Sequence, residues 1–218
     1  MWTETVKRNH VLPPIEKIEE HLILDATSPS GMRWKSHRGH VKAGDVAGTK
    51  KNDDGRWAVT FEGKRYYCYR LKIYMETGVD PGENDVDHKY RNLDDHANIR
   101  IATKSQNNAN REKKHSKCGR SVTSRYKGVY WCRKANKWVA MLRYKRKGYY
   151  LGAYVKEEEA AYIYNKAAEL IYGEFAYQNK LEQEMSLNLA LEVLDGIAAK
   201  FGPEAAPAPK GPAPVDAN

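Results

Sequence analysis

Residues 86–111 are the most informative stretch of this chain and read VDHKYRNLDDHANIRIATKSQNNANR. The stretch places an acid beside a histidine, Asp87-His88, and follows them with several asparagines. Its patterning predicts a short strand, a loop and a helix. An acid, amide groups and an imidazole can provide one divalent-cation site and one general base, and the flanking arginines can hold phosphate.

The composition narrows the class of protein. The chain has 218 residues, a hydrophobic content of 41% and a mean hydropathy of −0.80, which fits one or two soluble domains. No apolar run approaches the roughly 18 residues of a membrane span, and the N-terminus lacks the apolar core of a signal peptide. Cys68, Cys118 and Cys132 show no CxxC spacing. We therefore expect reduced thiols in a cytoplasmic protein, with no disulfide set and no structural zinc.

Positive charge is concentrated in residues 100–150, which contain sixteen Lys and Arg and a single acid, Glu112, a net of +15. The remainder has 21 basic and 27 acidic residues, a net of −6. Charge segregated in this way indicates a polyanion-binding surface. A solvated basic linker is the alternative. The interleaved aromatic residues argue against a linker, since a linker does not require them: Tyr126, Tyr130, Trp131, Trp138, Tyr144, Tyr149 and Tyr150.

The N-terminal half predicts small α and β elements. Apolar residues spaced by three and four over residues 13–26 predict a short helix that begins after Pro13-Pro14. Alternating apolar residues predict a β-hairpin over 56–69. A short helix over 70–78 is expected to close at Gly78.

The C-terminal half predicts three antiparallel strands, at 124–131, 137–144 and 148–154. A helix over 157–172, ended by Gly173, is expected to back one face of this sheet and leave the other open. The fold class is therefore α+β.

The 86–111 stretch resembles the DH…N-[LI]-R…QN..N signature of the HNH endonucleases, which occur free-standing in phage genomes and as homing nucleases. A hairpin, a helix ending in Thr-Gly and the Asp-His strand follow in the same order as in that family, so the resemblance covers about residues 15–113. It implies a ββα-metal module with one Mg²⁺ (or Mn²⁺) per active site. Asp87 and Asn107 are the expected metal ligands, with His88 as general base and Asn98 as the residue that braces the loop.

The loop between His88 and Asn98 is about two residues shorter than the family pattern. It contains Asp94, Asp95 and His96, any of which could replace or join a metal ligand. The expected phosphate contacts are Arg100, Asn110 and Arg111.

Residues 124–179 resemble the Apetala-two/ethylene-response-factor DNA-binding domain, which also accompanies HNH modules in phage nucleases. The residues that carry the resemblance are Tyr126-Lys127-Gly128-Val129, Lys137-Trp138, Leu142-Arg143, Tyr150-Leu151-Gly152, Glu158-Glu159-Ala160-Ala161, Tyr164, Ala167-Ala168 and Gly173. The resemblance implies a sheet that lies in the DNA major groove. The expected DNA-binding residues here are Lys127, Tyr130, Arg133, Arg143, Arg146 and Tyr150. Lys127, Tyr130 and Tyr150 stand where the plant proteins have Arg, Arg and Trp, so we do not expect the plant sequence preference to transfer.

The predicted organisation is a nuclease domain over 1–112, a basic linker over 113–123, a DNA-binding domain over 124–179, a C-terminal helix over 180–201 and a disordered Pro/Ala tail over 202–218. Such a chain would be a metal-dependent endonuclease of homing or mobile-element type that acts on double-stranded DNA in the cytoplasm of a bacterial host, encoded by a phage. A monomer or weak dimer is expected, and one metal centre per chain favours nicking. Two alternatives stay open: a non-catalytic phage DNA-binding regulator on a degenerate HNH scaffold, and a ribonuclease or RNA-binding protein.

Overall fold

The computed structural model describes residues 11–50, 55–90, 98–113, 116–117 and 120–182, with a few isolated positions beyond. The chain forms two compact units; the first includes the described residues up to Thr103 and the second those from Lys104 onward. Both contain helices and small antiparallel sheets, which confirms the α+β class. In the part of the chain described, no helix is long and apolar enough to cross a bilayer.

The first unit begins with a helix, α1 (Ile15–His21), which starts directly after Pro14 as predicted. The predicted helix was too long, because the next residues form strand β1 (Leu22–Leu24) instead. This strand pairs antiparallel with β2 (Met32–Trp34), and Leu22 faces Trp34 in the register. Pairing and burial of Leu22, which is 1% exposed, override the local helical spacing.

A small sheet of order β3-β4-β5 follows, made of β3 (Thr49–Lys50), β4 (Trp57–Phe61) and β5 (Lys64–Tyr67). It contains the predicted hairpin. Helix α2 (Cys68–Thr77) comes next and ends at Gly78, whose left-handed φ of 69° gives the expected C-terminal cap. A core containing Ile18, Met32 and Leu71 joins these elements.

The Asp-His strand is β6 (Asp85–His88), and it pairs antiparallel with β7 (Ile99–Ala102). The sequence pattern had predicted the first strand and a helix but not the second strand. The predicted helix is α3 (Lys104–Ala109), which belongs to the second unit.

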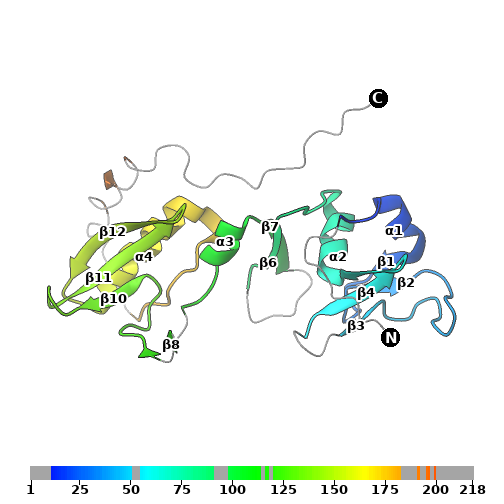
Figure 1. Ribbon diagram of the computed structural model, residues 1–218, viewed down its shortest axis with the longest axis horizontal. Coiled ribbons are helices and arrows are strands. Elements are labelled where there is room, and N and C mark those ends of the chain that lie inside the picture. Colours follow the sequence, from blue (N-terminus) through cyan, green and yellow to red (C-terminus); the bar gives the residue numbers. More distant parts are fainter. Residues whose placement is uncertain are drawn as a thin grey trace. The chain divides into compact units, whose positions relative to one another are not determined.

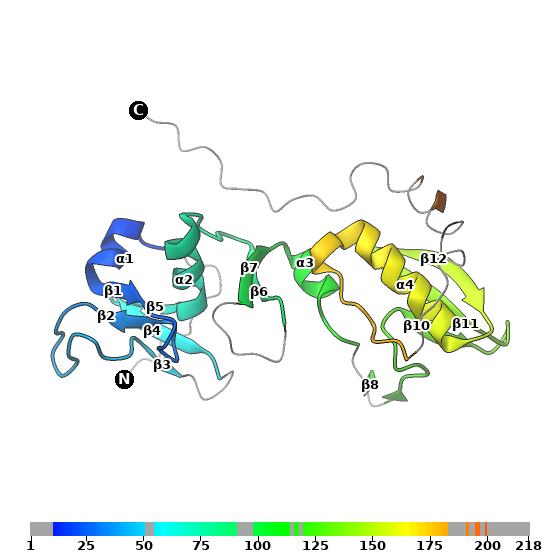
Figure 2. The same ribbon diagram turned by 180° about the vertical axis from the view of Figure 1, so that it is seen from behind.

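The second unit contains the predicted three-stranded sheet, of order β10-β11-β12, made of β10 (Val129–Cys132), β11 (Lys137–Tyr144) and β12 (Lys147–Tyr154). The predicted helix is α4 (Glu157–Tyr172), followed by the 3-10 turn η2 (Gly173–Phe175). Helix α4 lies behind the sheet in Figure 1 and in front of it in Figure 2. The region predicted as a linker contains two short paired strands, β8 (Ser116–Lys117) and β9 (Arg120–Ser121). The predicted C-terminal helix lies largely outside the described residues, and the predicted tail lies entirely outside them.

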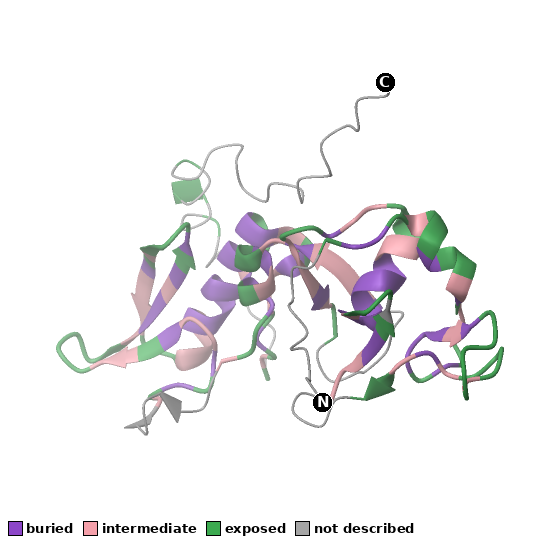
Figure 3. Ribbon diagram, turned by 45° about the vertical axis from the view of Figure 1, so that its right-hand side comes forward, coloured by how far each residue is buried: buried purple, intermediate pink, exposed green. Residues whose placement is uncertain are grey.

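Helix α4 covers one face of the sheet, and Figure 3 colours most of this helix as buried. On β11 the residues Ala140, Leu142 and Tyr144 are buried. The intervening residues Met141 and Arg143 alternate with them and point to the opposite face. That opposite face is the open face that the sequence predicted.

Candidate functional site

The β6–β7 ribbon pairs a buried acid with an arginine. Asp87 and Arg100 are opposite each other in the register. The Nε and Nη2 atoms of Arg100 both donate to Oδ2 of Asp87, at 3.1 Å each. The Asp87 side chain is 4% exposed and that of Arg100 is 13% exposed. The predicted metal ligand is thus a buried carboxylate whose charge is compensated by the residue predicted to contact phosphate.

His88 is the neighbour of Asp87 on β6 and is half-buried. Consecutive strand residues point to opposite faces, so the imidazole and the Asp87 carboxylate leave the ribbon on different sides. The ring centroids of His88 and Tyr69 lie 6.1 Å apart, in an edge-to-face arrangement with an interplanar angle of 65°. Tyr69 in turn stacks on Tyr67 and lies under the guanidinium of Arg56. Aromatic packing therefore restricts the ring of His88 on one side.

Asn98 is buried and holds the chain just after His88. Its amide nitrogen donates to the Tyr90 carbonyl at 2.7 Å, and its amide oxygen accepts from the Tyr90 N–H at 3.0 Å. The backbone carbonyl of Asn98 also accepts from the N–H of Lys89, at 2.8 Å. This is the geometry expected of a bracing residue, and its role in catalysis stays a prediction.

Two features of the first unit fix the ribbon. Val86 and Ile99 pack against a cluster that includes Ala58 and Tyr67. The segment that leads into β6 is held by Arg70, a buried residue whose guanidinium donates to the carbonyls of Gly82 at 2.7 Å and Asn84 at 3.0 Å. Burial lowers the pKa of this guanidinium. Both features hold β6 against α2 and the hairpin.

The donor chemistry of the predicted metal ligands fits a hard cation, since Asp87 offers a carboxylate oxygen and Asn107 an amide oxygen. Asn107 lies on α3 in the second unit and is half-buried. Among the described residues no group of three or more His, Cys, Asp or Glu side chains is arranged to hold a metal. The residues Asp94, Asp95 and His96 lie outside the described part of the chain.

The open face of the second unit carries several of the predicted DNA-binding residues. Tyr150 lies opposite Met141 in the register and is 60% exposed, and Tyr130 is 40% exposed. Arg143 is exposed on β11. Arg133 and Arg146 are exposed in the two turns that border β11. Two aromatic rings and three arginines are thus accessible on this face and its turns.

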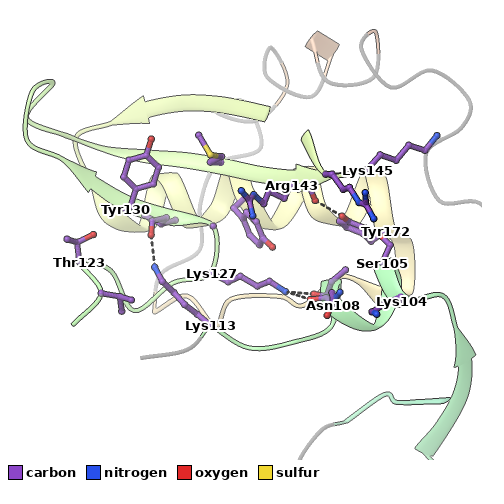
Figure 4. A pocket seen from close by; sticks show the side chains of 17 residues that line it. Lys104, Ser105, Asn108, Lys113, Thr123, Lys127, Tyr130, Arg143, Lys145 and Tyr172 are labelled. Atoms are coloured by element: carbon purple, nitrogen blue, oxygen red, sulfur yellow. Dashed lines mark hydrogen bonds between the residues drawn. The ribbon is translucent and has the colours of Figure 1, made fainter. Parts of the chain in front are cut away.

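A groove of about 1180 Å³ opens beside β11 in this unit. Strand β10 pairs with residues 137–140 of β11, and the N–H of the next residue, Met141, donates to the Gly128 carbonyl at 2.8 Å. The groove is lined by residues of α3, of β11 and of the turn that follows β11, and by Lys113, residues 122–123 and 127–130, Tyr164 and Tyr172 (Figure 4). Six lining residues are cationic, namely Lys104, Lys113, Lys127, Arg143, Lys145 and Arg146. No acidic residue is among the described residues that line it.

Two of these cations bind backbone carbonyls. The ammonium of Lys127 donates to the carbonyls of Asn108 at 3.2 Å and Arg111 at 2.6 Å, and also to that of Ala109, so it caps the C-terminus of α3. The ammonium of Lys113 donates to the carbonyls of Tyr126 and Val129. Burial lowers the pKa of Lys113. Lys127 therefore has a structural role that the sequence did not indicate, and its contact with DNA stays a prediction.

Four further residues lie at or near the groove or were predicted to contact phosphate. Asn110 is buried, and Arg111 is exposed directly after it. The hydroxyl of Tyr172 donates to the carbonyl of Arg143 at 2.6 Å, which closes part of the free edge of β11. Lys104 is exposed at the start of α3. Lys104 belongs to the basic stretch of residues 100–150, but the sequence-based prediction did not include it among the DNA-binding residues.

Comparison with known proteins adds no family assignment. The chain matches no model of a known protein family, and no curated protein matches it. The functional argument therefore rests on the residues and on the geometry described above.

Proposed function

We propose that the protein is a metal-dependent HNH-type endonuclease that hydrolyses phosphodiester bonds of double-stranded DNA. The observation that carries this proposal is the β6–β7 ribbon, which presents Asp87 and His88 in sequence and braces the following chain through Asn98. The residue types suit the chemistry, and their spacing resembles that of the HNH endonucleases.

His88 would accept the proton of the attacking water, because an imidazole has an ordinary pKa near 6.5 and can act as a base at neutral pH. Asp87, with Asn107, would hold one Mg²⁺ or Mn²⁺. The ion, when bound, stabilises negative charge on the phosphate and on the leaving 3′-oxygen. Asn98 would keep the backbone after His88 in place. One such centre per chain favours nicking of one strand.

The open face and its turns support DNA as the substrate. They carry Tyr130, Arg143 and Tyr150 in exposed positions, where arginine can bind phosphate or guanine and aromatic rings can contact bases or sugars. We expect the second unit to position the enzyme on the duplex.

The second candidate is a non-catalytic DNA-binding protein, possible because Arg100 already compensates the charge of Asp87. In that case the ribbon is a structural remnant, and the second unit alone provides function. The two candidates differ in whether His88 is needed for a chemical step.

The deciding experiment incubates supercoiled plasmid with Mg²⁺ or Mn²⁺ and the wild type, His88→Ala or the matched control His40→Ala, in which an exposed histidine is removed. We expect open-circular product with the wild type and with His40→Ala, and none with His88→Ala or with EDTA. Linear product without an open-circular precursor would indicate paired active sites. Binding without cleavage by the wild type would favour the regulator, and preferential binding of RNA at matched salt would favour the RNA alternative.

A further inference from the structure

The turn between β11 and β12 has an unusual backbone for its residues. It consists of Lys145 and Arg146, with Tyr144 and Lys147 paired on either side. Both turn residues have positive φ, 45° and 66°. Two consecutive left-handed residues define a type I′ turn, which strongly favours Asn-Gly or a similar pair because most side chains strain the backbone there. The chain thus has two long cationic side chains where hairpin stability favours small residues.

This turn lies on the rim of the basic groove beside β11. In Figure 4, Arg143 and Lys145 lie in the upper part of the view and Lys104 in the lower part. Lys104, Arg143, Lys145 and Arg146 are all exposed. Cations arranged around one hollow, with no acid among the described lining residues, create a local positive potential that attracts anionic groups.

The size of the groove favours a polymer over a small anion. Its volume of about 1180 Å³ exceeds the roughly 300–1000 Å³ of pockets that enclose drug-sized ligands. Its cations come from separate segments, α3, β11 and the β11–β12 turn. Separate charges along an open hollow suit successive phosphates of a chain better than one phosphate.

We propose that this groove is a binding site for the sugar–phosphate backbone of one DNA strand, and that the Lys145-Arg146 turn is kept in its strained conformation to place two cations on that backbone. We expect binding at this site to be independent of base sequence, because six of its lining residues are lysines or arginines, whose contacts with phosphate carry no sequence information. It continues the open face, since Tyr130, Met141 and Arg143 belong to both. The choice of DNA rests on the proposed function, whereas the binding of a phosphate polymer does not.

The test uses the double substitution Lys145→Asn with Arg146→Gly, which provides the preferred residues of a type I′ turn. We expect opposite effects on two quantities. The melting temperature should rise, because the strain is removed. The affinity for a mixed-sequence DNA duplex should fall, and the slope of log affinity against log salt between roughly 50 and 200 mM should decrease by about 2, one for each lost phosphate contact.

Fluorescence anisotropy measures the binding, and every variant carries His88→Ala so that the DNA stays intact. The control is Lys166→Gln with Lys180→Gln, which removes two charges from the same unit outside the groove and should leave the slope unchanged. Lys104→Met is a further variant that does not involve the turn, and it should reduce the slope by about 1.

Three results would overturn the proposal: an unchanged slope in both groove variants, an equal loss in the control, or a lower melting temperature in the turn variant. Inorganic phosphate or a nucleoside triphosphate that competes with the duplex at millimolar levels would show a small-anion site instead, and stronger binding of an RNA duplex would contradict DNA as the ligand. The binding measurements contain no catalytic step. Absence of plasmid cleavage by the wild type would therefore contradict the proposed function but not the proposed groove.

Discussion

Arg100 and Asp87 face each other across the β6–β7 ribbon, and two guanidinium nitrogens of Arg100 lie 3.1 Å from the same carboxylate oxygen. The pair is almost fully enclosed, so neither charge is well hydrated. A buried carboxylate left without a partner is costly, which explains why an arginine lies opposite the predicted metal ligand. The same contact means that a cation bound at Asp87 shares this carboxylate with Arg100 or displaces it.

Substitution of Arg100 tests this relationship. Arg100→Met should lower the free energy of unfolding by about 3 kcal/mol, because it leaves the Asp87 charge buried and uncompensated. Addition of Mn²⁺ should restore more stability to this variant than to the wild type, since the ion no longer competes with a guanidinium. Urea unfolding with and without Mn²⁺ measures both effects. The control is Arg65→Met, which removes a hydrogen bond from the Arg65 guanidinium to the neutral hydroxyl of Thr49. It should lower the free energy of unfolding by about 1 kcal/mol, with or without Mn²⁺. Equal responses of the two variants to Mn²⁺ would contradict a cation at Asp87.

Removal of the Asn98 side chain tests its bracing role. Asn98→Ala deletes both hydrogen bonds to the Tyr90 backbone, so the chain after His88 should lose its fixed path. We expect cleavage to fall roughly 10–100-fold with DNA affinity unchanged, as for residues that orient a catalytic group. Asn98→Asp keeps an acceptor for the Tyr90 N–H. Its cleavage rate should therefore lie between those of the wild type and the alanine variant. Cleavage at the wild-type rate by Asn98→Ala would show that the brace is not needed.

Several elements could be predicted from the sequence because local and tertiary preferences agree there. The hairpin of β4 and β5 has alternating apolar residues and a Gly63 turn, and α2 ends at Gly78 in the conformation that glycine favours. The sheet of the second unit and α4 follow from β-rich segments and a broad apolar helical face. For the candidate site, the resemblance of residues 86–111 to the HNH signature selected Asp87, His88 and Asn98, and their roles stay predictions.

Other features depend on partners distant in the sequence. Leu22 and Leu24 continue the helical spacing of α1 but pair with β2, a choice that is made by tertiary contacts. No periodicity in a four-residue segment such as β7 reveals its partner strand. The Arg100–Asp87 ion pair and the Lys127 contacts with α3 also join residues 13 or more positions apart, and both arginine and lysine looked like phosphate contacts in a basic stretch.

Stability in acid should depend on Asp25. Hydrogen bonds from Thr27, followed by that from Arg33, lower the pKa of Asp25 from 3.8 to about 2. A lowered pKa favours the folded state wherever the unfolded side chain is already ionised, so this contribution is complete above about pH 4 and is lost as the pH falls towards 2. Asp25→Asn should therefore show a smaller decrease in melting temperature than the wild type across this range. The measurement is the melting temperature of each protein between about pH 5 and about pH 2, and an equal decrease in the two proteins would contradict the assignment.

Lys127 should stabilise α3 in the absence of any nucleic acid. Lys127→Met removes a charged donor from three carbonyls at the end of the helix and should cost about 2 kcal/mol locally. Amide hydrogen exchange of residues 104–111 measures this directly and should become faster. The control Lys166→Met loses a surface pair with Glu169 and should change exchange there by less than about 0.5 kcal/mol. Unchanged exchange in α3 would leave Lys127 as a nucleic-acid contact alone.

Substitution of Gly128 tests the packing of α4 in the second unit, and Gly63 in the first unit provides the matched control. Their φ angles are almost equal, 76° and 74°, so an alanine suffers the same backbone strain at either position. A Cβ atom at Gly128 would lie 1.9 Å from the Tyr164 ring, whereas at Gly63 it would meet nothing within 4 Å. Gly128→Ala should therefore lower the free energy of unfolding by about 1–3 kcal/mol more than Gly63→Ala, because the well-packed Tyr164 must move. Urea unfolding of both variants gives this difference, and equal losses would mean that the sheet and α4 do not pack as closely as the Gly128–Tyr164 contact requires.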